Sequence, residues 1–100
     1  MYVLEVRFSK SGEDCFVYKE RFIDAFFKAG FLIREIESNL YEFKLFDKEK
    51  GKEKVFEILD SLSFSKYIYW YVNLCILHEY KRGKEKTRLN LLCNYDNLKK

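Results

Sequence analysis

The sequence contains no proline, and only four glycines and one histidine stand among its 100 residues. So little proline and glycine excludes collagen-like, low-complexity and linker chains. No apolar run approaches the roughly 18–20 residues needed to span a bilayer. Residues 1–10 also do not have the basic start and apolar core of a signal peptide. We therefore expect a soluble, cytoplasmic chain with no membrane partner.

The cysteines do not form a metal-binding pattern. Cys15, Cys75 and Cys93 are spread along the chain without a CxxC motif, and only His78 could join them as a zinc ligand. An odd cysteine count without a signal peptide favours a reducing compartment. Phosphate-loop, dinucleotide, nucleophile-elbow and zinc-protease motifs are absent as well. We predict no catalytic residue, no metal and no cofactor.

The overall composition is typical of a folded domain. Hydrophobic residues make up 48% and charged residues 35% of the sequence, and aromatic residues reach 19%. This length suits one domain. We expect a single α+β domain over residues 1–100, with a body over 1–80 and a basic hairpin tip and C-terminal strand over 81–100.

The first half of the sequence predicts a strand, a helix and a hairpin. Residues 2–8 alternate apolar and polar positions, which indicates a half-buried strand. Apolar residues recur at helical spacing over 13–29, and Gly30 stands where a left-handed cap would end that helix. Residues 31–38 and 41–45 favour two strands of a hairpin.

A second helix is expected after this hairpin, with Asp47 as its cap. Gly51 is expected to fray its first turn. The helix would bury one narrow apolar stripe, formed by Val55, Ile58, Leu59 and Leu62.

The last third of the sequence predicts a long hairpin. Residues 67–80 indicate one strand, with Tyr67, Tyr69 and Tyr71 on one face and Trp70 and Val72 on the other. Residues 87–95 indicate its partner strand, although a helix over residues 87–98 remains an alternative.

The expected turn of this hairpin is a type II′ turn at Gly83-Lys84. That turn places Ile76 opposite Leu91. It also pairs the opposite charges of Glu79 with Arg88 and of Arg82 with Glu85.

The order of the expected elements is strand, helix, strand, strand, helix, strand and a further strand. The first six form the βαββαβ pattern of ferredoxin-like folds. We expect an antiparallel sheet with two helices on one face, and an extra C-terminal strand that forms a long β-hairpin with strand 4. The expected core lies between sheet and helices and includes these residues: Leu4, Val6, Phe8, Phe43, Leu45, Trp70, Val72, Phe22, Phe26, Ile58 and Leu62.

Over residues 1–80 this layout resembles the small CRISPR-adaptation nucleases and the virulence-associated toxin ribonucleases. A strand that starts at Met1 and the Gly30-Phe31 step carry the resemblance. It implies a ferredoxin-like fold and a homodimeric, metal-dependent nuclease. The adaptation nucleases have an aspartate at the end of the first strand, where this sequence reads Phe8-Ser9-Lys10.

Two surfaces are candidates for binding. Residues 81–100 carry seven basic and two acidic residues, a net charge of +5, whereas residues 1–80 carry −2. Cations on a two-stranded arm can neutralise phosphates, and the candidates are Lys81, Arg82, Lys84, Lys86 and Arg88. The second surface is the row of Tyr67, Tyr69 and Tyr71, which suits base stacking or a protein interface.

These features favour a small non-catalytic interaction protein. Its expected partner is a nucleic acid or a nucleoprotein complex, with a host protein as a further candidate target. By analogy, a short chain of this composition suits a phage or mobile-element inhibitor of host defence, of the anti-CRISPR type. A homodimeric nuclease and a homodimeric structural or regulatory module are the alternatives.

Overall fold

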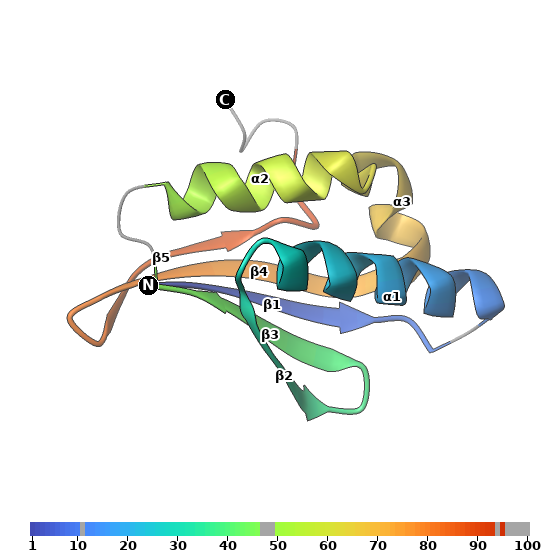
Figure 1. Ribbon diagram of the computed structural model, residues 1–100, viewed down its shortest axis with the longest axis horizontal. Coiled ribbons are helices and arrows are strands. Elements are labelled where there is room, and N and C mark those ends of the chain that lie inside the picture. The colour runs from blue at the N-terminus through green and yellow to red at the C-terminus, as the bar shows by residue number, and fades with distance from the viewer. Residues whose placement is uncertain (11, 47–49, 94, 96–100) are drawn as a thin grey trace.

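The computed structural model describes residues 1–10, 12–46, 50–93 and 95. This part of the chain is α+β, with a five-stranded antiparallel sheet and three helices (Figure 1). The elements are β1 (Tyr2–Phe8), α1 (Glu13–Lys28), β2 (Leu32–Glu37), β3 (Leu40–Leu45), α2 (Gly51–Ser61), α3 (Phe64–Tyr71), β4 (Val72–Lys81) and β5 (Lys84–Asn90).

The strands lie in the order β2-β3-β1-β4-β5, and every neighbouring pair is antiparallel. Helices α1 and α2 cover the same face of the sheet (Figure 1). The hairpin of β4 and β5 therefore forms one edge, and β2 forms the other.

The predicted first helix is confirmed, together with its glycine cap. Gly30 has a φ of +90°, a backbone conformation that costs glycine little. The chain turns back there, because the Phe31 N–H donates to the Phe26 carbonyl at 3.1 Å. The rings of Phe26 and Phe31 then pack edge to face at 4.9 Å.

The predicted hairpin of β2 and β3 is also confirmed, with Asn39 in its turn at a φ of 63°. The second helix begins at Gly51, and Asp47, its expected cap, lies outside the described residues. Gly51 is buried against the ring of Tyr2. Its small size therefore serves a close approach, whereas the sequence had suggested a frayed turn.

The single strand expected over residues 67–80 is wrong. Residues Phe64–Tyr71 form α3, and the strand begins only at Val72. Phe64, Tyr67 and Tyr71 recur at helical spacing and join or pack on the core, whereas Trp70 points outward and is 74% exposed. Residues 67–72 are apolar at every position, so they fit the helical period of 3.6 residues and the strand period of two equally well. Packing against α1 and α2 therefore decides between helix and strand.

The hairpin of β4 and β5 is confirmed, but its expected turn and register are wrong. Lys81 pairs with Lys84, so Arg82 and Gly83 form the two-residue loop. Their φ values of 54° and 79° are typical of a type I′ turn. A bulge between Glu79 and Tyr80 shifts the ladder.

The turn and the bulge together place Ile76 opposite Asn90, where Leu91 had been expected. Strand β5 ends at Asn90, so the strand predicted to Tyr95 is too long. Leu91 turns into the core and its N–H donates to the Cys75 carbonyl at 2.8 Å. The helix considered over residues 87–98 is excluded for residues 87–90, which are strand.

The core between sheet and helices is aromatic. Its largest fully buried side chains are Phe8, Phe22, Phe26, Phe43 and Phe64. The predicted core residues are buried with two exceptions: Ile58 is partly buried, and Trp70 is exposed. Val3, on the opposite sheet face, is also buried.

Candidate nucleic-acid interface

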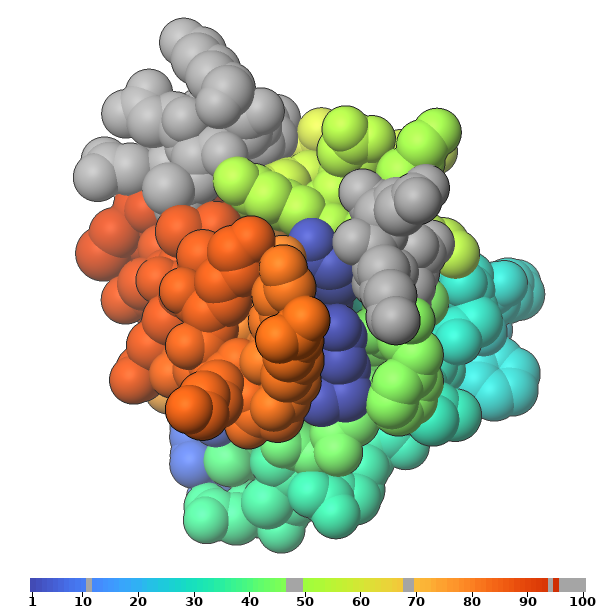
Figure 2. Space-filling view, turned by 90° about the vertical axis from the view of Figure 1, so that its left-hand side faces the viewer, coloured from blue at the N-terminus to red at the C-terminus, as the bar shows by residue number. Residues whose placement is uncertain are grey.

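The five cations singled out in the sequence lie together on the hairpin of β4 and β5. All of them are exposed, and we call them the basic hairpin end: Lys81, Arg82, Lys84, Lys86 and Arg88. Figure 2 shows the hairpin, in orange, facing the viewer beside the N-terminal residues in blue. Among the described residues, no ion pair within 4.0 Å involves any of the five.

The pairs expected between Glu79 and Arg88 and between Arg82 and Glu85 therefore do not form. The Glu85 carboxylate lies 2.6 Å from Nδ1 of His78, whose Nε2 lies 3.2 Å from the Glu5 carboxylate. Glu85 of the hairpin is thus engaged by His78 and not by a cation of the basic hairpin end.

The second glutamate is held on the helix side of the sheet. Glu79 accepts hydrogen bonds from the Tyr2 hydroxyl at 3.2 Å and the Thr87 hydroxyl at 3.3 Å. The register that the bulge imposes places Thr87 opposite Glu79 and Arg88 opposite His78. Glu79 thereby lies opposite the neighbour of its expected partner, whereas Glu85 lies opposite Tyr80 because Arg82 belongs to the turn.

The backbone of Met1 lies at the same end of the molecule. The Met1 ammonium donates to the Tyr80 carbonyl at 3.1 Å, and the Tyr80 N–H donates to the Met1 carbonyl at 2.8 Å. An open groove of about 390 Å³ lies here. It is lined by Met1, Tyr2, Glu79, Tyr80, Lys81, Arg82 and Lys86.

Electrostatically, this groove is a cationic surface with one carboxylate. Lysine and arginine that have no counter-ion among the described residues can contact phosphate or carboxylate groups of a partner. A two-stranded β-ribbon is also narrow enough to enter a DNA major groove.

The expected tyrosine row is wrong, because its residues belong to α3. Tyr67 and Tyr71 pack with Tyr18 of α1, at ring-centroid distances of 5.7 and 5.2 Å. The side chain of Tyr69 lies outside the described set. The i, i+4 spacing of Tyr67 and Tyr71 was the signal for a shared helical face.

The position of α3 also separates the two expected surfaces. Helix α3 lies at the opposite end of the molecule from the turn of the β4–β5 hairpin (Figure 1). A shallow cavity of about 190 Å³ beside Tyr67 and Tyr71 belongs to that distant end. The tyrosines and the basic hairpin end therefore do not form one continuous contact surface.

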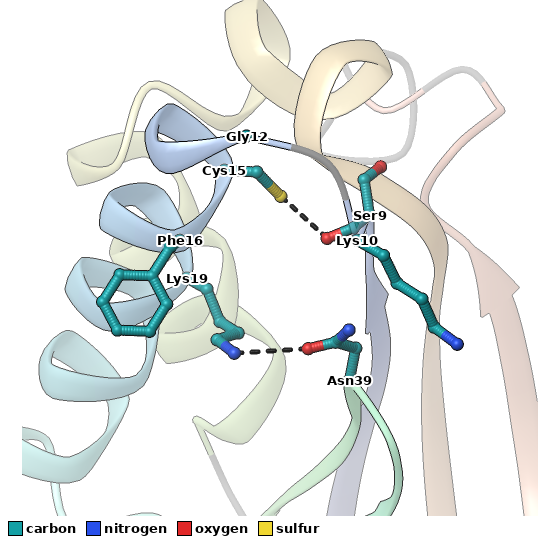
Figure 3. A pocket seen from close by; sticks show the side chains of 7 residues that line it. All are labelled: Ser9, Lys10, Gly12, Cys15, Phe16, Lys19 and Asn39. Atoms are coloured by element: carbon teal, nitrogen blue, oxygen red, sulfur yellow. Dashed lines mark hydrogen bonds between the residues drawn. The ribbon is translucent and has the colours of Figure 1, made fainter.

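A smaller pocket, of about 80 Å³, lies at the start of α1 (Figure 3). The Cys15 thiol donates to the Ser9 carbonyl at 2.9 Å, and Lys19 donates to the Asn39 side-chain oxygen at 3.2 Å. Burial raises the pKa of the Cys15 thiol, although Lys19 and the Ser9 contact lower it in part. The raised pKa favours the protonated thiol, which is a weaker nucleophile than the thiolate.

Within the described ranges, no group of three or more His, Cys, Asp or Glu side chains is placed to hold a metal ion. No helix in the same ranges is long and apolar enough to cross a membrane. No protein-family model matches the chain, and no curated protein or solved structure shows significant similarity to it.

Proposed function

We propose that this protein is a non-catalytic interaction module that binds the phosphate backbone of a nucleic acid through its basic hairpin end. The observation that carries the proposal is the set of five exposed cations without a counter-ion among the described residues. Each phosphate that a lysine or arginine neutralises releases condensed counterions, so affinity depends steeply on salt. With three to five contacts, the slope of log K against log salt is expected at about −2.7 to −4.5 on duplex DNA.

We also propose that the body of the chain is ferredoxin-like. The strand order β4-β1-β3-β2 and the location of α1 and α2 on one face support this assignment, with β5 as an addition at the edge. The setting that we propose is the cytoplasm. There the module would bind a nucleic acid or a nucleoprotein complex, as an inhibitor of host defence of the anti-CRISPR type.

The test is a titration of fluorescently labelled 20-mers, as duplex DNA, single-stranded DNA and RNA, at several salt concentrations. The variant Arg82→Glu/Lys84→Glu/Lys86→Glu reverses three charges of the basic hairpin end. The control Lys10→Glu/Arg21→Glu/Lys66→Glu changes the net charge equally at exposed positions elsewhere. We expect the hairpin variant to lose at least tenfold in affinity and the control to lose less than threefold.

Equal losses in both variants would mean that net charge alone drives binding, and unchanged affinity in the hairpin variant would reject the site. Cleavage of the 20-mers that stops on addition of chelator would contradict the non-catalytic assignment and favour a nuclease.

A further inference from the structure

An imidazole on the sheet lies between two carboxylates. His78 of β4 points to the sheet face opposite α1 and α2 (Figure 1), because its neighbour Leu77 belongs to the core and side chains alternate along a strand. Its Nδ1 lies 2.6 Å from the Glu85 carboxylate of β5, and its Nε2 lies 3.2 Å from the Glu5 carboxylate of β1. The His78 side chain is 12% exposed. This cluster spans three neighbouring strands and reaches the hairpin that carries the basic hairpin end.

Hydrogen-bond chemistry determines the charge that this arrangement requires. An ionised carboxylate only accepts hydrogen bonds, whereas a neutral imidazole has one N–H donor and one acceptor nitrogen. Both ring nitrogens of His78 face carboxylate oxygens, and both can donate only when the ring is the imidazolium. The observed contacts therefore fit the protonated ring, with one positive charge between two negative charges.

On the β5 side of the ring, a second cation competes for Glu85. Arg88 lies directly opposite His78, and Glu85 lies opposite Tyr80, two residues further along β4. The Tyr80 ring stacks on the His78 ring with 6.0 Å between centroids. Because cross-strand partners share a face, Glu85 and Arg88 are neighbours on the face that bears His78. Glu85 can thus neutralise either the imidazolium or the guanidinium.

On the β1 side, Glu5 depends more strongly on the imidazole. It lies directly opposite Glu42 of β3, and like charges at such positions repel. Arg34 and Lys44 lie 2.8 and 3.7 Å from the Glu42 carboxylate. Among the described residues, His78 is the one basic group within 4.0 Å of Glu5. A ring with a single proton is therefore expected to keep it on Nε2, toward Glu5.

We infer that His78 and Glu85 form a pH-dependent switch that regulates the basic hairpin end, an inference that rests on the proposed function. The protonated ring holds the Glu85 carboxylate away from the cations. When Nδ1 releases its proton to solvent, it becomes an acceptor and repels the Glu85 carboxylate, which turns to Arg88 on the same face. Arg88 thereby gains a counter-ion, and the surface loses one phosphate contact.

Nucleic-acid binding is accordingly strongest at mildly acidic pH and weakens as pH rises, because histidine is the side chain that ordinarily changes charge between about pH 5 and 8. Each phosphate contact contributes about 0.9 to the salt slope on duplex DNA, so neutralising Arg88 should reduce the slope by about 0.9. At about 0.1 M salt this corresponds to an affinity loss of about fivefold to tenfold.

Titration of the duplex 20-mer at pH 5.5 and 8.5, in about 0.1 M salt, tests the switch. We expect the parent protein to bind about fivefold to tenfold more weakly at pH 8.5. Glu85→Gln keeps the titrating ring but removes the carboxylate, so its affinity should differ by less than twofold between the two pH values. The matched control Glu20→Gln, at an exposed position of α1, should keep the pH dependence of the parent. If Glu85→Gln keeps it too, release of Glu85 is not the cause and the inference fails.

The chain contains a single histidine, so its ring nitrogen-15 resonances report the switch without any nucleic acid. We expect both ring nitrogens to be protonated at pH 5.5 and only Nε2 at pH 8.5. A proton that stays on Nδ1 at pH 8.5 would overturn the inference, because Glu85 would remain bound.

The two arms also separate this inference from the proposed function. Salt-dependent binding that is equal at both pH values would overturn the switch and leave the proposed function standing. Absence of binding at both pH values would reject the proposed function and, with it, the regulation.

Discussion

Gly51 lies so close to the ring of Tyr2 that a Cβ atom at residue 51 would overlap the ring atoms. Tyr2 in turn donates its hydroxyl hydrogen bond to Glu79 on β4. The start of α2, the start of β1 and the base of the hairpin are therefore connected through one aromatic side chain. This contact adds a side-chain link to the backbone ladder that joins β1 and β4.

Gly51→Ala is expected to destabilise the protein by about 1–3 kcal/mol, because the added methyl group overpacks a buried site. Urea denaturation measures the loss. In a Tyr2→Ala background the same substitution should cost clearly less, since the ring that it meets is gone. Additive costs in the double variant would show that the clash with Tyr2 is not the cause.

Phe22→Ala is expected to cost about 3–5 kcal/mol, because it opens a cavity in the aromatic core. The Phe22 ring lies 5.2 Å from that of Phe8, 5.0 Å from that of Phe26 and 5.4 Å from that of Phe43. Phe46→Ala is the matched control, since Phe46 is 63% exposed, and it should change stability by less than about 0.5 kcal/mol. Comparable losses from both substitutions in thermal unfolding would contradict this core.

Alkaline pH is expected to destabilise the fold. Burial raises the pKa of the Cys75 thiol above its ordinary value of 9.0 and that of the Tyr18 phenol above 10.0. Above pH 9 the unfolded chain loses these protons while the folded chain keeps them, so the free energy of unfolding falls as pH rises.

Urea denaturation between pH 7.5 and 10.5 measures this decline. In Cys75→Ala the free energy of unfolding should fall less steeply with pH, because one of the two buried titratable groups is removed. Val6→Ala, which truncates the residue paired with Cys75 across the sheet, should lower stability equally at every pH. An unchanged pH slope in Cys75→Ala would argue against the thiol.

Arg82→Asn should separate the structural role of the turn from its role in binding. Residue 82 has a φ of 54°, which asparagine tolerates better than arginine, so stability should rise by up to about 1 kcal/mol. Loss of one cation should weaken phosphate binding and reduce the salt slope by about 0.9 on duplex DNA. Arg82→Lys keeps the charge and is expected to match the parent protein in affinity. If Arg82→Asn and Arg82→Lys both bind more weakly, more than the charge of residue 82 is needed for binding.

Much of the fold follows from local sequence patterns. The period of two in β1 and β3, the apolar stripe of α1 and the glycine that ends it are local signals, because neighbouring residues alone determine which face each side chain takes. The position of the five cations on one hairpin was predictable in the same way, since they follow one another closely around a short loop.

What the sequence did not determine was any feature that depends on distant contacts. Residues 67–72 are apolar at every position and fit a helix or a strand, and packing of α3 against α1 and α2 selects the helix. The bulge at Glu79 and the turn at Arg82-Gly83 set the register of β5, and this register separates Glu79 and Glu85 from the expected cations. The sequence determines which residues are charged, whereas the assembled sheet determines which residue each charge lies against. The reason is that a shift of one residue in the register changes the cross-strand neighbour of every residue in the strand.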